Sequence, residues 1–413
     1  MDDSSMAAAR AKPAPSAATA GFLDAVRRFT AFGTSTLAHV DAGIPYLVNE
    51  FWTAGQRQAH SLHEVSYRAC FKPQLPDFFI DRLTAPNEGV YDPFMGRGTT
   101  PLQAALRGRR PMGNDINPLS VLLLRPRLAP PSLPAITAAL KSVPWDAKAE
   151  APKELLAFYH PRTLARLAAL RAHLLARAPL HDTAPDPALD WVRMVAINRL
   201  TGHSPGFFSV YTLPPNQAVS VAAQRKINLS RAQTPPERDI AALILKKSRA
   251  LLKSGAVPPH PPGLLSVGPA EAAKAIPDAS AALVVTSPPF LDIVQYAADN
   301  WLRCWFAGID VEQVAIAQHR TEAAWQNMVR ATLSDLARIV RPGGHVAFEV
   351  GEVRGAKVLL ERLVWAAAEG LPFAREAVLV NQQDFTKTAN CWGVANNAKG
   401  TNTNRIVLLR RLG

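Results

Sequence analysis

The strongest indication of the fold is the stretch Gly89-Val-Tyr-Asp-Pro-Phe-Met-Gly-Arg-Gly-Thr-Thr100. It begins as a short apolar strand that ends in an acid, Asp92, and a tight Gly-x-Gly turn then leads into a helix over Pro101–Leu106. Glycine lets the backbone approach a ligand closely, and a new helix offers free N–H groups to a carboxylate. This order is typical of the first βα unit of a nucleotide-binding sheet. It is neither a dinucleotide Gly-x-Gly-x-x-Gly motif nor a phosphate loop, because no Gly-Lys-Ser/Thr follows.

A second acid follows about two dozen residues later, in Met112-Gly-Asn-Asp115-Ile-Asn-Pro118. An acid at the end of the second strand is where such sheets hold the hydroxyl groups of a ribose. The alternative is that Asp115 caps the helix expected over Leu119–Leu124. The glycine turn upstream favours ribose binding.

Another apolar run, Leu283-Val-Val285, stops at Thr286-Ser-Pro-Pro-Phe290. A run of this kind indicates a buried strand that leaves its sheet at the prolines. Proline fixes its own φ and has no N–H, so the carbonyls here are held rigidly with few local donors competing for them. Rigid acceptors beside an exposed aromatic ring suit a flat, amino-bearing ring such as a nucleobase. The alternative is an ordinary Pro-Pro turn.

Residues 125–263 interrupt the sheet pattern. Helices are expected over Leu155–Arg177, Asp190–Leu200 and Asp239–Lys253, separated by an irregular stretch that leads into Gln224-Arg-Lys-Ile-Asn228. Residues 125–265 contain 19 lysines and arginines against 8 acids, an excess of 11 positive charges. Basic helices are often only solvated faces, but charge concentrated in one insertion favours phosphate contacts. Arg225 and Lys226 are the candidate DNA-binding residues.

The remaining elements complete an α/β pattern. Residues 1–20 are expected to form a disordered tail, and residues 21–60 one or two short helices. Strands and helices then alternate, with a short helix expected after Glu271. The expected elements are helices Leu75–Leu83 and Thr321–Val340, strands Leu264–Val267 and His345–Val350, and a final antiparallel pair, Phe373–Asn381 and Arg405–Arg411.

Composition limits the functional classes. The 413 residues are 48% hydrophobic, enough for a sizeable core, and the net charge of +13 favours a polyanionic partner. Three scattered cysteines, with no Cys/His spacing typical of zinc, predict a reducing cytoplasm and no metal site. No apolar run reaches the roughly 18 residues that a membrane span needs.

Taken together, these motifs resemble the amino-directed DNA methyltransferases. The resemblance covers residues 63–125 and 264–413, in the order Phe-Lys-Pro, Asp-Pro-Phe loop, acid, insertion, Thr-Ser-Pro-Pro, Pro-Gly-Gly turn. An insertion between the cofactor half and the catalytic half resembles the α-type arrangement. The resemblance implies a Rossmann-like S-adenosylmethionine-dependent methyltransferase sheet. Residues 21–125 would form its cofactor half, 126–263 a mostly helical target-recognition insertion, and 264–413 its catalytic half.

The resemblance also implies a role for each matching residue. Those expected to bind S-adenosylmethionine are Phe71, Asp92, Phe94, Gly96, Gly98, Thr99 and Asp115. Those expected to hold the target base are Ser287, Pro288, Pro289 and Phe290. Serine at the first position of the motif resembles the N4-cytosine enzymes more than the N6-adenine enzymes.

Three positions depart from the family pattern. Phe290 replaces a tyrosine, Gly268-Pro-Ala stands where Gly-Asp-Ala is usual, and Ala281-Ala282 replaces a frequent acid. The second change removes the expected partner of the adenine N6 atom of the cofactor.

The expected activity is methyl transfer to the exocyclic amine of a base flipped out of double-stranded DNA. Three alternatives stay open: N6-adenine DNA methylation, RNA base methylation, and a non-catalytic nucleic-acid-binding protein on this fold. A C5-cytosine reaction is disfavoured because no cysteine lies in a Pro-Cys motif. A cognate restriction endonuclease is a further partner that the resemblance allows.

Overall fold

The computed structural model of the chain describes residues 17–53, 59–67, 70–182, 184–213, 218–289, 296–314, 319, 321–351, 358–382 and 403–413. The strands are β1 (Leu37–Asp41), β2 (Ile44–Asn49), β3 (Gly89–Asp92), β4 (Arg110–Asp115), β5 (Leu264–Val267), β6 (Ala281–Thr286), β7 (Val340–Val350), β8 (Phe373–Gln382) and β9 (Thr403–Arg411). They form one sheet in the order β1-β2-β8-β9-β7-β6-β3-β4-β5.

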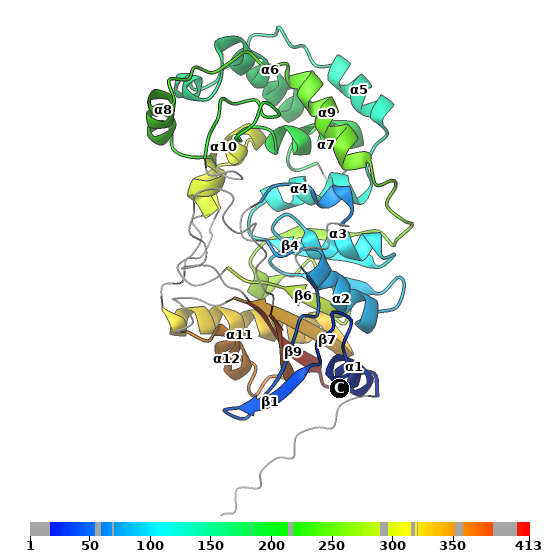
Figure 1. Cartoon of the computed structure of the whole chain (residues 1–413). Coiled ribbons are helices and arrows are strands. Elements are labelled where there is room, and N and C mark those ends of the chain that lie inside the picture. Colours follow the sequence, from blue (N-terminus) through cyan, green and yellow to red (C-terminus); the bar gives the residue numbers. More distant parts are fainter. Residues whose placement is uncertain are drawn as a thin grey trace, which may run out of the picture.

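The helices pack on both faces of this sheet and above one end of it (Figure 1). They are α1 (Ala17–Arg27), α2 (Gln74–Leu83), α3 (Thr99–Leu106), α4 (Leu119–Leu128), α5 (Leu133–Lys141), α6 (Pro161–Arg177), α7 (Pro187–Ile197), α8 (Val221–Ser230), α9 (Ile240–Leu252), α10 (Tyr296–Ala307), α11 (Glu322–Ile339) and α12 (Leu360–Ala367). Among the described helices, none is long and apolar enough to cross a membrane.

The middle of the sheet is parallel. Strands β5, β4, β3, β6 and β7 pair in parallel, whereas β9 lies antiparallel between β7 and β8. The final antiparallel pair predicted from the sequence is therefore confirmed. Because β3 has β4 on one side and β6 on the other, the winding of the chain reverses between β3 and β6. Open α/β sheets bind ligands at the carboxyl ends of the strands at such a point.

Alternation along the strands gives the sheet two apolar faces. Leu283 and Val285 of β6 pack with the aromatic residues of α1 and α2, whereas Val284 packs with α11 and α12. All three side chains are fully buried. A period of two explains this division, because successive side chains of a strand point to opposite faces.

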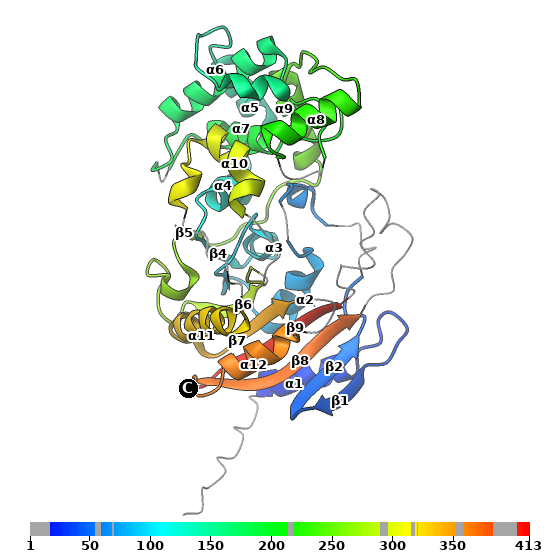
Figure 2. The same ribbon diagram turned by 90° about the vertical axis from the view of Figure 1, so that its left-hand side faces the viewer.

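Helices α5 to α9 form a separate layer above the sheet (Figure 2). Their core is continuous with α4 and α10, and it contains Trp191 of α7, whose Nε1 donates to Ser248 Oγ of α9 at 2.9 Å. A bidentate ion pair between Arg125 of α4 and Asp190 of α7, with N–O distances of 2.8 and 3.0 Å, joins this layer to the sheet. The three domain boundaries stay a prediction.

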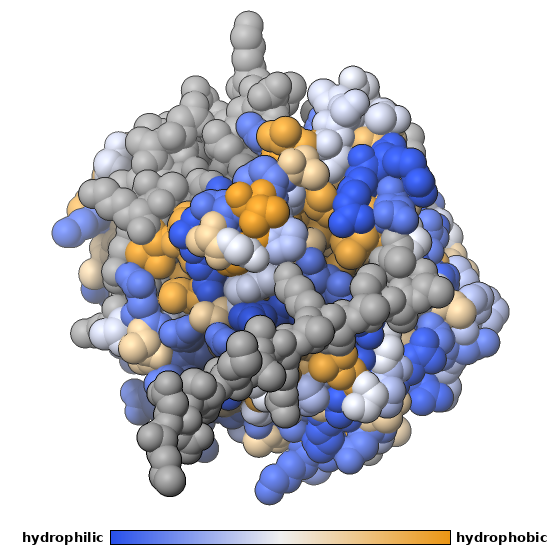
Figure 3. Space-filling model, turned by 90° about the horizontal axis from the view of Figure 1, so that it is seen from below, coloured by the Kyte–Doolittle hydropathy of each residue, from blue (hydrophilic) through white to orange (hydrophobic). Residues whose placement is uncertain are grey.

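Residues 21–60 contain one of the one or two short helices expected there, α1, which begins at Ala17, inside the predicted tail. Among the described residues of this range, no other helix follows Arg27. The next residues form the β1-β2 hairpin, with positive φ at Ala42 (48°) and Gly43 (76°) in a two-residue turn. Such a turn matches the twist of a hairpin. The end of the molecule that carries β1 shows separate apolar patches among polar residues (Figure 3).

Two predicted helices are also wrong in extent. Leu155–Arg177 is divided into a 3-10 turn, η2 (Lys153–Ala157), and α6, because proline at 161 forces His160 into an extended conformation with ψ 146° and then begins the new helix. The helix expected after Glu271 is only the 3-10 turn η3 (Ala270–Ala272).

Candidate active site

The two motifs read from the sequence meet at the carboxyl ends of β3 and β6. Thr286 donates its hydroxyl to Asp92 Oδ1 at 2.6 Å, across 194 positions of sequence, and the backbone N–H of Phe94 donates to the same oxygen at 3.1 Å. Asp92 is 1% exposed, and burial raises its pKa to about 7. The site is therefore built at the point where the winding of the sheet reverses.

A cavity of about 510 Å³ opens beside this contact. Most of the predicted site residues line it: Phe71, Asp92, Phe94, Gly96, Thr99, Asp115, Ser287 and Pro289. Residues of α11, among them Asn327 and Met328, form the opposite wall. The predicted cofactor residues and the predicted base-holding residues thus share one cavity.

The glycine turn is held by the second acid. Asp115 accepts from the N–H of Gly96 at 2.8 Å and from the N–H of Asn117 at 2.9 Å. Gly96 has φ 50°, a conformation that side chains rarely adopt. Burial raises the pKa of Asp115. Asp115 does not cap α4, whose N-cap is Pro118 and has no side-chain cap hydrogen bond; Asn117 Oδ1 accepts from Leu119 N at 3.0 Å just before the helix.

Gly98 lies elsewhere than expected, since it is not among the residues that line the cavity. It has φ 77°, and a Cβ atom built there would lie 2.6 Å from Leu124 Cδ1. The positive φ and the close packing of Leu124 of α4 are enough to require glycine at 98, whatever ligand binds nearby.

Behind Ser287 lies a buried acid, Glu349 of β7. Glu349 Oε1 accepts from Asn404 Nδ2 at 2.9 Å. Burial raises the pKa of Glu349, while hydrogen bonds from Ser287 and Asn404 lower it. Because the Ser287 hydroxyl donates to this carboxyl group, its lone pairs are free to accept a hydrogen from another group.

The two proline carbonyls of the motif differ in their hydrogen bonding. Trp325 of α11, which is fully buried, donates its Nε1 to Pro289 O at 2.9 Å. That bond fixes the Pro-Pro turn against α11 and occupies the Pro289 carbonyl. Pro288 is buried, and Phe290 lies outside the described residues.

Sequence reasoning missed several residues of the site. Glu349 and Trp325 are separated from Thr-Ser-Pro-Pro by dozens of positions and belong to no local motif; an acid in the buried strand after Pro-Gly-Gly was the one available signal. Glu271 lies on the cavity, two positions after the proline that replaces the usual acid, so the cavity does contain an acid on that side. Tyr67 also lines the cavity, close to Gly96.

The candidate DNA-binding residues do not line this cavity. Arg225 and Lys226 are exposed on α8 of the helical layer, where Gln224 is buried and donates to Tyr211 O at 3.0 Å. Within the described ranges, no three His, Cys, Asp or Glu side chains gather as metal ligands would.

Comparison with known proteins finds a family that part of the chain matches. Residues 45–123 match a protein-family model of N6/N4 methyltransferases described as "DNA methylase". A curated relative, the type II methyltransferase M.MjaII of Methanocaldococcus jannaschii, is 35% identical over 72 residues, which are 17% of this chain. The match spans 13% of the length of that relative. The family model covers β3, the glycine turn and Asp115, so this part of the chain is similar to the amino-methyltransferases.

Solved structures give the following likenesses. TrmN from Thermus thermophilus is 13% identical with a TM-score of 0.33, over 84% of this chain and 50% of that one. A SAM-dependent methyltransferase from Methanosarcina mazei is 9% identical with a TM-score of 0.32, over 81% of this chain and 97% of that one. The chain itself has the Rossmann-like α/β sheet that the sequence predicts, with β4 and β6 flanking β3.

Proposed function

We propose that the chain is a DNA methyltransferase that transfers a methyl group from S-adenosylmethionine to the exocyclic amino group of a flipped base, N4 of cytosine. The observation that supports this most is that one cavity is lined by Asp92, Asp115 and Ser287 together. The DNA methylase match covers the first two of these residues.

The cavity suits the cofactor. Asp92 is a buried carboxyl group and Asp115 a half-buried one on the cavity, and neither forms an ion pair with a described residue. A buried acid without a cation is costly unless a ligand supplies hydrogen bonds or charge. S-adenosylmethionine has an ammonium group and ribose hydroxyls, and when bound it supplies an electrophilic methyl group. We assign its binding to Phe71, Asp92, Phe94, Gly96, Thr99 and Asp115, with Gly98 holding the turn.

The residues of the Thr-Ser-Pro-Pro-Phe motif suit an amino group as their ligand. The cytosine amine is a weak nucleophile because its lone pair is delocalised into the ring. Acceptors at Ser287 Oγ and the Pro288 carbonyl would bind both amino hydrogens and turn the lone pair toward the methyl group. Trp325 already occupies the Pro289 carbonyl, so the proposal uses the carbonyl of Pro288, a buried residue that is not among those lining the cavity. Phe290 would stack on the base, and positioning supplies the remaining rate enhancement.

The test separates this proposal from its alternatives. The purified protein is titrated with S-adenosylmethionine by calorimetry and then incubated with radiolabelled cofactor and either duplex DNA or RNA. Cofactor binding with label transferred to DNA is expected. Absence of cofactor binding would indicate a non-catalytic nucleic-acid-binding protein, and label transferred only to RNA would exclude DNA as the substrate.

Cofactor affinity should rise with pH up to about 7. The pKa of Asp92 is raised by burial to about 7, so the carboxyl group is mostly neutral in the free protein below that pH. If the ionised form binds the ammonium group, affinity should fall up to about tenfold for each pH unit below 7. Calorimetry between pH 5.5 and 7.5 measures this, with Asp92→Asn as the control. Equal pH dependence in wild type and Asp92→Asn would exclude Asp92 as the group responsible.

Arg225 and Lys226 should contribute to the salt dependence of DNA binding. Removing one phosphate contact flattens the slope of log K against log salt by roughly 0.9, so the slope of the double alanine variant should be shallower by roughly 1.8. Binding of duplex DNA is measured by fluorescence anisotropy over a series of salt concentrations. Both residues are exposed on α8, so the variant should melt at the wild-type temperature. An unchanged slope would mean that these two side chains do not contact phosphate.

A further inference from the structure

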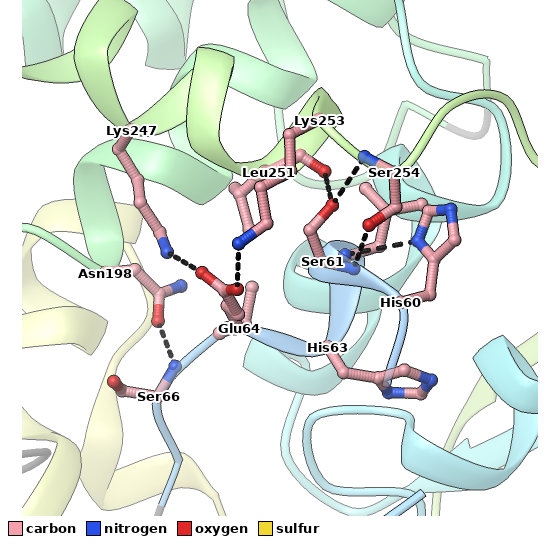
Figure 4. Close-up of polar contacts among 12 residues, drawn as sticks. His60, Ser61, His63, Glu64, Ser66, Asn198, Lys247, Leu251, Lys253 and Ser254 are labelled. Atoms are coloured by element: carbon pink, nitrogen blue, oxygen red, sulfur yellow. Dashed lines mark hydrogen bonds and ion pairs between the residues drawn. The ribbon is translucent and has the colours of Figure 1, made fainter. Parts of the chain in front are cut away.

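A group of cations lies where the helical layer meets the segment His60–Tyr67, which leads to the cavity. It consists of Arg199, just after α7, Lys247 of α9 and Arg303 of α10, and we call these three residues the junction cations. The segment passes between them. Glu64 lies 3.5 Å from Lys247 Nζ, and the N–H of Ser66 donates to Asn198 Oδ1 at 2.9 Å (Figure 4).

Arg199 is a cation held in place without an anion. Its guanidinium lies over the Phe207 ring, 4.0 Å from the centroid, and its Nε donates to Asn198 O at 2.8 Å. Among the residues that the structure describes, Arg199 forms no ion pair, and no acceptor is found for its two terminal nitrogens. Burial and the charge of Arg303 lower its pKa to about 10, so it remains charged at neutral pH.

Two acids lie near the group, Asp299 beside Arg303 and Glu64 beside the lysines, and Glu64 is shared. Glu64 accepts from Lys253 Nζ at 3.0 Å as well as from Lys247, so one carboxylate faces two lysines. Burial lowers the pKa of Lys247, and the charge of Arg199 lowers it further. Arg199 therefore keeps a charge with no paired anion among the described residues, in a partly buried place, which costs free energy until an anion binds.

The position of the group indicates which anion this is. Arg303 lies over the ring of Tyr67, 5.9 Å from its centroid, and Tyr67 lines the candidate cofactor cavity. Arg303 thus connects the junction cations to that cavity through Tyr67, although none of the three is among the residues that line it. A stacked, planar guanidinium is suited to bidentate hydrogen bonding with a phosphate.

We propose that Arg199 and Lys247 bind a backbone phosphate of the nucleic-acid strand that carries the target base. The inference rests on the proposed function and names a contact site that differs from exposed α8. Asn198 and Glu64 connect this contact site to the segment that carries Tyr67, which would place the bound phosphate beside the base pocket. Arg225 and Lys226 would contact the duplex farther away.

The test compares Arg199→Gln and Lys247→Gln with the control Lys246→Gln. Lys246 is the neighbour of Lys247 on α9, but its side chain is exposed, and no ion pair is found for it among the described residues. Affinity for mixed-sequence duplex DNA is measured over a salt series. Each junction variant should bind roughly tenfold more weakly and flatten the slope by roughly 0.9, and the control should match wild type.

Thermal melting distinguishes a phosphate-binding role of Arg199 from a purely structural one. Removing Arg199 relieves repulsion, so the free variant should melt at or above the wild-type temperature, while the rise in melting temperature on adding inorganic phosphate should shrink. A lower melting temperature with an unchanged slope would make Arg199 structural and overturn the inference. An equal loss in Lys246→Gln would also overturn it, because the whole basic helix would then hold the phosphate.

The same data separate this inference from the proposed function. Wild-type protein that binds no DNA at any salt concentration would remove the proposed partner. Wild-type binding with normal slopes in both junction variants would remove only the phosphate site. Methyl transfer is not needed for either measurement.

Discussion

Alanine in place of Ser287 should lower the rate of methyl transfer roughly 10²–10³-fold while leaving cofactor affinity near that of wild type. The hydroxyl of Ser287 donates to Glu349 and lies on the cavity, so it is oriented to accept from an amino group. Removing it would remove an acceptor used in the transition state without changing the Asp92 side of the cavity. Single-turnover kinetics with radiolabelled cofactor measures the rate, and calorimetry measures the affinity.

Two further variants sharpen this test. Ser280→Ala removes an exposed hydroxyl at the start of the same strand and should leave the rate unchanged. Glu349→Gln should slow transfer, because an amide can donate to Ser287 and compete for its lone pairs. If Ser287→Ala instead lowers the melting temperature and the cofactor affinity together, the serine is a turn former and the catalytic assignment fails.

Valine in place of Gly98 should destabilise the fold strongly. The positive φ of 77° costs a side chain about 1–3 kcal/mol, and the contact with Leu124 at 2.6 Å adds overpacking of about 1–3 kcal/mol. Urea unfolding should therefore show a lower midpoint, and cofactor binding should weaken only through the loss of folded protein.

The neighbouring glycine and Leu124 supply the controls. A Cβ at Gly96 would lie 3.5 Å from Tyr67 Cε1, an ordinary contact, so Gly96→Ala should destabilise less while altering the cavity wall. In a double-mutant cycle, Leu124→Ala should cost less stability in the Gly98→Ala background than in wild type, because it also removes the clash. A Gly98→Val variant of normal stability that no longer binds cofactor would show that the ligand, and not α4, requires this glycine.

The core of the fold was predictable because its signals are local. Val284 and its neighbours form a continuous β-branched run, as a strand buried on both faces requires, and the glycine turn has few structural alternatives. Sequence patterns were weakest where tertiary contacts decide the outcome. The β1-β2 hairpin uses Ala42 at positive φ, and alanine gives no turn signal. The break before α6 follows from a single proline at 161, within an otherwise helical pattern.

The candidate site divides in the same way. Asp92, Gly96 and Ser287 belong to short motifs and lie together on the cavity as expected. Glu349 and Trp325 act through contacts across 62 and 36 positions, and no local pattern predicts such pairs. The sequence motif predicted a glycine at position 98. It could not predict the packing of Gly98 against Leu124, because that contact depends on how α4 is placed.

The most direct test of the proposed function is the identity of the methylated nucleoside. Duplex DNA is incubated with the protein and S-adenosylmethionine, digested to nucleosides and analysed by mass spectrometry, with Ser287→Ala as the blank. N4-methylcytosine that is present with wild type and absent with the variant is the predicted result. N6-methyladenine would show that Ser287 does not select cytosine, and the absence of any methylated DNA base, with methylation of RNA alone, would contradict the proposal.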